Sequence, residues 1–446
     1  PVNENIYACF KNGNVWSYQQ LTNPINALPN LRVIMMDDED RLYQGYVDIY
    51  RIQSLSGSPY IQLPWQKISD FPGNFGVGPT HWIKAMASAP SSPNIIYAAV
   101  DSRSWTPGVV QPMLFKTTIG GGQAPSDWTD ISQLLPSSVT EYLSIISIAV
   151  DPEDPERLWI GCGGHERDWG LPAPYNGKSR VFQTEDGGQT WSDMSEGLPP
   201  LAVTDLVYQR GSDDGIYLAT DVGVFYRDAS MTQWECYNDG MSPTIVNDLE
   251  IDHCARKLYA SVHGRGYWVT DLMETAHERL ITSDLTIGGK QYLASSMRVA
   301  AGATLTITGT IKCYEGARII VEPHARLVID GGTITTQCPG TRWVGIEVHG
   351  TSTQNQAGGA LATYQGKLEV KNGGTIENAY MGAFAGARIP GGDLDDWDWT
   401  KTGGIISASN STFKNCQWGV LLLPWPDPNG GLSINSTNAS RFTNCT

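Results

Sequence analysis

Short apolar runs separated by polar turns fill the first 272 residues of the chain. One pattern recurs: an apolar strand, a turn rich in Asp, Pro or Ser, a second strand with an aromatic residue, and a third strand. Almost no segment places apolar residues at helical spacing over three turns, so the pattern predicts strands and an all-β fold. The recurring units begin with residues 32–47, 84–100, 148–162, 206–220 and 249–262.

A tryptophan opens the expected fourth strand in the first four units. These residues are Trp65, Trp128, Trp191 and Trp234. Four antiparallel strands per repeat of about 40 to 60 residues are typical of a β-propeller blade. Residues 5–20 fit the second and third strands of an earlier blade that lacks its first strand. We therefore predict a β-propeller over residues 1–272, incomplete at its N-terminal end, with six blade traces.

The stretch TEDGGQTW at residues 184–191 lies between an expected third and fourth strand. It resembles the Asp-box (Ser/Thr-x-Asp-x-Gly-x-Thr-Trp) of sialidases, sortilin-type receptors and xyloglucanases, in which the box is structural and lies away from the active site. An Asp side chain can accept hydrogen bonds from nearby backbone N–H groups, Gly can take the left-handed conformation, and Trp can pack between blades. We therefore expect a structural turn rather than a catalytic carboxylate. The matching residues are Thr184, Asp186, Gly188, Thr190 and Trp191.

After a polar connector at residues 273–280 the pattern changes. Short β runs are separated by Gly, Asn and Asp, with no helices between them. Short β runs that recur every twenty to thirty residues or so are typical of a solenoid, so we predict a right-handed parallel β-helix over residues 281–446. Within it, Cys416 and Cys445 follow the shared pattern Phe-x-Asn-Cys. We expect them at the same position of neighbouring coils, either as a buried ladder, which we favour, or as a disulfide.

This second segment resembles the β-helical regions of large secreted proteins of Bacteroidota-type bacteria, with GIEVHG (345–350) and GGTIENAYMG (373–382) as the best matching stretches. Such proteins often pair an Asp-box propeller with a β-helix, and they usually carry a C-terminal domain for type IX secretion. The resemblance implies a secreted or cell-surface protein, anchored to the cell envelope through a C-terminal domain beyond Thr446. We expect the β-helix to be incomplete at its C-terminal end.

Charge and cysteine usage narrow the function classes. The net charge of −16 argues against nucleic acid as a partner, because phosphate binding needs clustered Lys and Arg. No apolar run is long enough to span a membrane. The eight cysteines are scattered, without the paired spacing of a zinc site. They fit an exported protein with some disulfides, and a cytosolic protein with buried thiols is the alternative.

Two long insertions, at residues 101–112 and 163–178, fall on the propeller face opposite the Asp-box turns. Aromatic rings stack on sugar faces and Arg pairs with carboxylates, so these insertions suit an acidic or neutral glycan. The competing interpretation is that their tryptophans pin the loops to the propeller. The candidate binding residues are Arg103, Trp105, His165, Arg167, Asp168, Trp169 and Tyr175.

A third insertion, at residues 387–404, belongs to the expected β-helix. Its aspartates offer oxygen ligands at a spacing compatible with calcium, although the full calcium-loop pattern is missing. Trp397 and Trp399 are candidates for stacking on sugar, and the competing interpretation is a solvated loop whose tryptophans cover the coil. No cofactor is required, and calcium is the candidate. Its possible ligands are Asp393, Asp395, Asp396 and Asp398.

Three function classes remain. The first is a secreted or cell-surface adhesion protein that recognises glycan or protein through propeller loops, with the β-helix as a rigid stalk. The second is a carbohydrate-active enzyme, which needs two carboxylates across a cleft for hydrolysis, or calcium beside a basic residue for a β-helix lyase. The third is a passive spacer of a very large surface protein. The sequence shows no such carboxylate pair, and no acidic cluster beside a suitable Arg or Lys in the β-helix, so it favours the binding protein.

Overall fold

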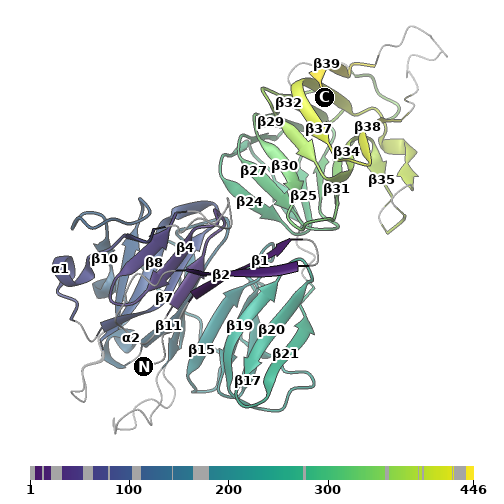
Figure 1. The fold of residues 1–446 in the computed structure, drawn as a ribbon. Helices are drawn as coiled ribbons and strands as arrows, with labels where there is room; N and C mark the ends of the chain where they lie inside the picture. Colours follow the sequence, from purple (N-terminus) through teal and green to yellow (C-terminus); the bar gives the residue numbers. More distant parts are fainter. Residues whose placement is uncertain are drawn as a thin grey trace. The chain divides into compact units, whose positions relative to one another are not determined.

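The computed structural model divides the chain into two compact units that are built almost entirely from strands (Figure 1). The first unit contains residues 1–209, 214–252 and 257–272, and the second contains residues 210–213, 253–256 and 273–446. The all-β prediction is confirmed. The structure describes residues 6–12, 15–21, 33–53, 64–78, 81–102, 112–142, 144–163, 180–274, 278–356, 361–389, 391–393, 396–423, 425 and 438–446.

The first unit is a five-bladed β-propeller with antiparallel blades whose strands pair in chain order. The first two blades are β3 (Val33–Met36), β4 (Leu42–Gly45), β5 (Ile49–Ile52) and β6 (Gln66–Lys67), then β7 (His81–Ala89), β8 (Ser92–Ser102), β9 (Met113–Thr117) and β10 (Thr129–Asp130). The next two are β11 (Ser144–Val150), β12 (Leu158–Gly163), β13 (Val181–Thr184) and β14 (Ser192–Asp193), then β15 (Val203–Tyr208), β16 (Ile216–Thr220), β17 (Gly223–Arg227) and β18 (Glu235–Cys236). The fifth blade has three strands, β19 (Val246–Asp252), β20 (Lys257–Val262) and β21 (Gly266–Asp271).

The remaining elements of this unit are short. Strands β1 (Ile6–Asn12) and β2 (Val15–Leu21) form a separate antiparallel hairpin, which corresponds to the first, incomplete blade trace of the sequence pattern. The helices are α1 (Phe71–Phe75), the 3-10 turn η1 (Ser132–Leu134) and α2 (Ser137–Tyr142). Among the described residues, no helix is long and apolar enough to cross a membrane.

The tryptophan pattern of the blades is confirmed, because a Trp directly precedes each of β6, β10, β14 and β18. The buried Trp128 packs against Phe71 and Phe115, and its indole N–H donates to the Ile68 carbonyl at 2.8 Å. Burying an aromatic ring of this size and satisfying its N–H makes a large contribution to blade packing.

The second unit is a stack of parallel strands that closes almost into a coil of the β-helix type. One sheet contains β22 (Arg279–Ile281), β25 (Ser296–Val299), β28 (Arg318–Val321), β31 (Trp343–Val348), β34 (Ala379–Ala385) and β38 (Trp418–Leu422). The other runs in the order β23 (Leu285–Ile287), β26 (Thr304–Ile307), β29 (Arg326–Asp330), β32 (Lys367–Lys371), β37 (Ile405–Lys414), β33 (Thr375–Glu377), β30 (Thr333–Thr336), β27 (Thr310–Cys313) and β24 (Lys290–Leu293), and β39 (Arg441–Cys445) also pairs with β37. A small hairpin, β35 (Ala387–Arg388) and β36 (Trp397–Asp398), precedes the 3-10 turn η2 (Trp399–Lys401).

Aliphatic ladders hold this coil together. Successive strands stack in register, so that Ile287, Ile307, Ile329, Val370 and Ala408 form one column. All five side chains are buried in one continuous core. Because fully burying such a side chain stabilises by about 1.5–3 kcal/mol, the ladders account for the regular stacking of the coils.

The predicted match between Cys416 and Cys445 is wrong. Cys445 pairs with Ser411 of the neighbouring strand, and both cysteines are free thiols. The two Phe-x-Asn-Cys copies do not stack, because Phe442 lies opposite Ala408. The second unit instead contains a disulfide between Cys254 and Cys338, in accord with the expectation of an exported protein with some disulfides.

Candidate functional site

The propeller residues that the sequence proposes for binding lie outside the described residues. They are Arg103, Trp105, His165, Arg167, Asp168, Trp169 and Tyr175. Binding through these two insertions stays a prediction. The candidates within the described part of the chain are those of the third insertion, in the second unit.

The turn at residues 184–191 is organised by Asp186. Its carboxylate accepts hydrogen bonds from the backbone N–H groups of Gln189 and Thr190 and from the hydroxyls of Thr184 and Thr190, at 2.7–2.9 Å. The hydrogen bond from the Thr190 hydroxyl, followed by those from the Thr190 N–H and the Thr184 hydroxyl, lowers the pKa of Asp186 to about 2. All of these contacts lie within the turn itself, which is the geometry expected of a structural turn. The assignment to the Asp-box stays a prediction.

The third insertion forms a hairpin that presents an indole to solvent. In the hairpin, Ala387 pairs with Asp398 and Arg388 with Trp397. Trp397 is half-buried against Phe384, with ring centroids 5.9 Å apart. Trp399 is 56% exposed and lies 6.1 Å from the Trp397 ring. Trp397 therefore covers the coil, and Trp399 is free to meet a ligand.

The predicted calcium site includes Asp395, which lies outside the described residues, so it stays a prediction; none of the described residues belongs to a group of three or more acidic, His or Cys side chains placed to hold a metal. Asp396 accepts a hydrogen bond from the Asp393 N–H at 3.0 Å. Asp398 accepts from the N–H and the hydroxyl of Thr400, at 3.0 and 2.6 Å, and so caps η2. These carboxylates hold the backbone of the hairpin, and Asp395 lies outside the described residues.

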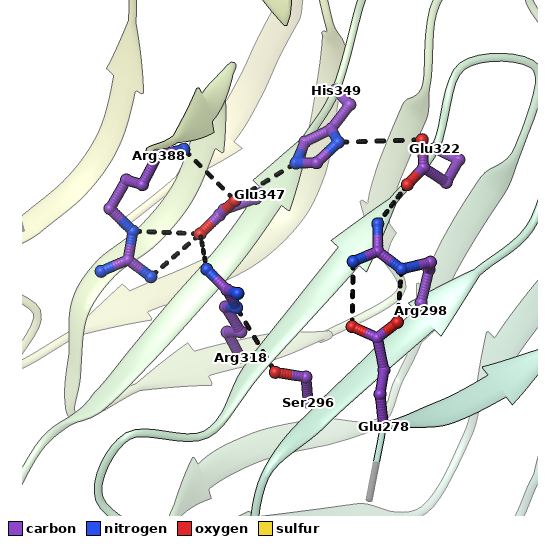
Figure 2. Close-up of polar contacts among 8 residues, drawn as sticks. All are labelled: Glu278, Ser296, Arg298, Arg318, Glu322, Glu347, His349 and Arg388. Atoms are coloured by element: carbon purple, nitrogen blue, oxygen red, sulfur yellow. Dashed lines mark hydrogen bonds and ion pairs between the residues drawn. The ribbon is translucent and has the colours of Figure 1, made fainter. Parts of the chain in front are cut away.

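A buried carboxylate, Glu347 on β31, contacts Arg388 of the hairpin (Figure 2). It is 2% exposed. It accepts hydrogen bonds from Arg388 Nε at 3.0 Å, from Arg388 Nη2 at 2.9 Å and from the Arg388 backbone N–H at 3.4 Å. Arg318 Nη1 on β28 donates to the same carboxylate at 3.4 Å. Because Arg388 belongs to β35, these contacts fix the first strand of the hairpin to the coil.

A glycine sets the direction of the Glu347 strand. Pairing of β31 with β34 is irregular between Gly345 and Ile346. Gly345 has φ of 123°, and a Cβ there would lie 1.6 Å from the Met381 carbonyl oxygen, so only glycine fits this irregularity. Ile346 and Val348 enter the aliphatic core. Since side chains alternate along a strand, Glu347 points away from that core, towards Arg388.

A histidine links Glu347 to a second carboxylate. His349 Nε2 lies 3.2 Å from Glu347 Oε2, and its Nδ1 lies 3.8 Å from Glu322 Oε2. Glu322 also pairs with Arg298, which forms a two-point contact with Glu278 at 2.6 and 2.9 Å (Figure 2). The ion-pair network therefore runs without interruption across the outer surface of one sheet. We call these residues, Glu278, Arg298, Arg318, Glu322, Glu347, His349 and Arg388, the coil network.

The coil network favours the charged form of its members. Burial raises the pKa of Glu347, but the His349 hydrogen bond and the charges of Arg388 and Arg318 outweigh it and bring the pKa to about 2. The pKa of Glu322 also falls to about 2, chiefly because the His349 imidazole lies close to its carboxylate. Burial lowers the pKa of His349, yet its two carboxylate neighbours raise it overall. The His349 imidazole therefore lies between two carboxylates that favour its protonated form.

The contacts of this arrangement join three backbone segments. Glu347, His349 and Arg388 are all buried, so in this geometry none of them can contact a substrate. Their partners are one another, and they hold β31, β28 and the hairpin together. The Trp399 indole, in the 3-10 turn η2 directly after the hairpin, remains accessible.

The sequence interpretation missed the coil network, in which arginines pair with carboxylates of neighbouring strands. The network was missed because strand register cannot be read from the sequence when coils differ in length. In the structure Arg298 aligns with Ile320, and Ile320 aligns with Glu347. A hint is present in GIEVHG, where Glu347 and His349 share one strand face by alternation. Their partners cannot be found until the strands are stacked.

Comparisons with known proteins assign the chain to no family. No protein-family model matches the chain, and no curated protein matches its sequence. A GH74 enzyme of Niastella koreensis is similar, with 14% identity, a TM-score of 0.37 and coverage of 52% of this chain and 33% of that chain. The extracellular domain of a putative one component system from B. thetaiotaomicron has 14% identity, a TM-score of 0.38 and coverage of 59% and 31%. A YCF48 structure bound to D1 peptide has 14% identity, a TM-score of 0.37 and coverage of 59% and 69%.

The chain spans about a third of the length of the GH74 enzyme and of the extracellular domain that it matches. Similarity at this level leaves activity, ligand and partner to be argued from the residues of this chain.

Proposed function

We propose that this chain is a secreted or cell-surface binding protein of the adhesin type, which recognises a glycan or a surface protein and uses the parallel coil as a rigid stalk. The observation that carries the proposal is the exposed Trp399, which begins the 3-10 turn η2 directly after a hairpin that a buried ion pair fixes to the coil. An exposed indole on a rigid support suits a sugar face, because stacking buries apolar area without ordering a flexible loop.

The propeller insertions are proposed to extend this recognition. Arg103, Trp105, Arg167 and Trp169 combine aromatic rings with guanidinium groups, which suits a glycan that carries carboxylates. Calcium at Asp393, Asp395, Asp396 and Asp398 is proposed as an optional ligand of the third insertion, although Asp396 and Asp398 already accept hydrogen bonds from its backbone.

Export is supported by the cysteines. The Cys254–Cys338 disulfide is of a kind that persists in oxidising compartments. The resemblance of residues 281–446 to secreted proteins of Bacteroidota-type bacteria supports type IX secretion and anchoring at the cell envelope through a further domain. Carbohydrate hydrolysis or elimination is less well supported, because the carboxylates and arginine nearest the hairpin are buried.

The test is a glycan-array measurement on the full chain, with and without calcium. We compare Trp399→Ala with Trp418→Ala, a matched control whose indole is also exposed, on β38 of the same unit. We also measure the Trp105→Ala/Trp169→Ala variant. Binding that is lost in Trp399→Ala and kept in Trp418→Ala supports recognition by the hairpin. Loss only in the double variant moves recognition to the propeller insertions, and no binding by a folded chain overturns glycan recognition.

A further inference from the structure

A pocket of about 220 Å³ lies between the third and fourth propeller blades. Its walls come from the second and third strands of both blades and from the turns beside them. All of its lining residues belong to the first compact unit. Those that decide its chemistry are Arg157, Gln183, Met194, Arg227 and Met231.

The corresponding place between the second and third blades is filled by an ion pair. Strand register shows the equivalence, because Lys116 pairs with Tyr97 in the second blade as Gln183 pairs with Trp159 in the third. The Lys116 ammonium reaches the carboxylate of Glu156 on the next blade. Gln183 is shorter and neutral, so the equivalent place between the third and fourth blades stays open.

Gln183 brings an amide without a protein partner to this pocket. It is only 9% exposed, and its side chain forms no hydrogen bond within the described part of the chain. It shares a strand face with Val181, which packs in the apolar cluster between the two blades. The equivalent residue of the fourth blade, Tyr226, donates its hydroxyl to Asp228 at 3.1 Å. Since buried polar groups are normally hydrogen-bonded, the Gln183 amide marks a place for a ligand atom.

Arg227 brings a positive charge that the pocket does not neutralise. Its Nη1 donates to the Met194 carbonyl at 3.2 Å. Its Nε is buried without an acceptor, and its guanidinium forms no ion pair with any residue that the structure describes. Burial lowers the pKa of Arg227, although the charge of Glu196 raises it. A guanidinium with most of its N–H donors unused is suited to a two-point contact with a carboxylate.

The other charged groups of the pocket are already engaged. Arg157 forms ion pairs with Asp214 and, at 3.9 Å, with Glu185. Asp228 accepts hydrogen bonds within its own turn. Arg227 is therefore the positive charge of the lining that has no counterion among the described residues. One such charge matches a ligand with a single negative charge, and the three carboxylates of the lining disfavour a doubly charged anion such as phosphate.

We propose that this pocket binds a small monocarboxylate of about the size of one sugar ring, such as a uronate, with Arg227 on the carboxylate and the Gln183 amide on a hydroxyl. The volume is below the roughly 300–1,000 Å³ of sites for drug-sized ligands, which limits the ligand to a small molecule or a single sugar residue. Met194 and Met231 supply an apolar wall that adapts to the ligand. The pocket does not include Trp399, so this binding does not rest on the function proposed above.

The test is a calorimetric titration of the full chain with glucuronate, with glucose and inorganic phosphate as comparison ligands. We expect saturable binding of glucuronate. Glucose is expected to bind at least about tenfold more weakly, because it lacks the charge-assisted hydrogen bonds of a carboxylate. Absence of glucuronate binding by the folded chain overturns the proposal, and so does binding of glucose or phosphate that is as tight as that of glucuronate.

Two variants locate the site. Arg227→Gln is expected to weaken glucuronate binding by about tenfold or more, and Gln183→Met by about threefold or more. Arg265→Gln, which removes an exposed arginine of the same propeller, is the matched control and should leave binding unchanged. Trp399→Ala should also leave it unchanged, which separates this pocket from recognition by the second unit.

Thermal unfolding establishes that each variant is folded. If Arg227→Gln does not fold, because its hydrogen bond to Met194 is lost, Gln183→Met decides the question alone. Glucuronate affinity that is unchanged in every folded pocket variant overturns the proposal, because the ligand is then bound elsewhere.

Discussion

Replacing Glu347 by Gln tests whether the coil network anchors the hairpin. The change keeps the shape of the side chain and removes its charge. Glu347 is the carboxylate to which Arg388 donates two side-chain hydrogen bonds, and both residues are buried. The variant leaves the Arg388 guanidinium buried beside a neutral amide.

The expected cost follows from that geometry. Breaking a buried ion pair by removing one partner typically costs about 3–5 kcal/mol, because the remaining charge is left uncompensated. Arg388→Met is expected to cost less, since Glu347 keeps Arg318 at 3.4 Å and His349 at 3.2 Å. In the double variant the two effects should not add, because both changes remove the same contact.

Native-state hydrogen exchange of the β34 and β35 amides is the assay, because it reports the local opening free energy in a chain with two units. The control is Glu369→Gln, whose carboxylate also pairs with an Arg on the outer surface of the coil but is more exposed. A loss below about 1 kcal/mol in Glu347→Gln, or equal losses in Glu347→Gln and Glu369→Gln, would refute the anchoring argument.

Two further predictions concern pH and redox state. The pKa values of Glu347 and Glu322 lie at about 2, below the ordinary 4.5. The stability that these two carboxylates contribute should therefore be lost as pH falls from about 4.5 to 2. A Tm that stays constant over this pH range would contradict the prediction. His349, with a raised pKa, has the opposite sign and loses its contribution as pH rises through its folded value. Opening the Cys254–Cys338 bridge, which closes a loop of 84 residues, should cost about 4–5 kcal/mol, and a Tm unchanged by reductant would contradict that estimate.

The propeller could be predicted from the sequence because each blade signals itself locally. An aromatic second strand, a third strand and a tryptophan recur within one blade, and the structure places Trp65, Trp128, Trp191 and Trp234 directly before the fourth strands. The parallel coil could be predicted for a related reason, since its short β runs and Gly or Asn turns are also local features. Both predictions depend on patterns that a few dozen residues contain.

The candidate site was harder to predict from the sequence, because its side-chain contacts depend on how the strands of successive coils stack. The coils differ in length: Val321 stacks on Val348 but Ile329 stacks on Val370, so a fixed spacing cannot align them. That is why Cys445 lies opposite Ser411 rather than Cys416. The same difficulty hid the pairing of Glu347 on β31 with Arg388 of β35, the strand that follows the adjacent strand β34. The exposed Trp399 was identified, because an aspartate-rich insertion is visible in the sequence.

Strand β37 has a consequence for how the coil comes apart. Its first residues pair with β32 and its last residues with β33, so one continuous strand joins two columns that are separate in the earlier coils. In a stack where each layer contacts only its neighbours, unfolding spreads layer by layer from an end. A break that travels along one column cannot pass β37 without opening the other column as well. We therefore expect unfolding that starts at one end to halt at β37 until both columns open together. The layers on the other side of β37 then unfold only after that single cooperative step.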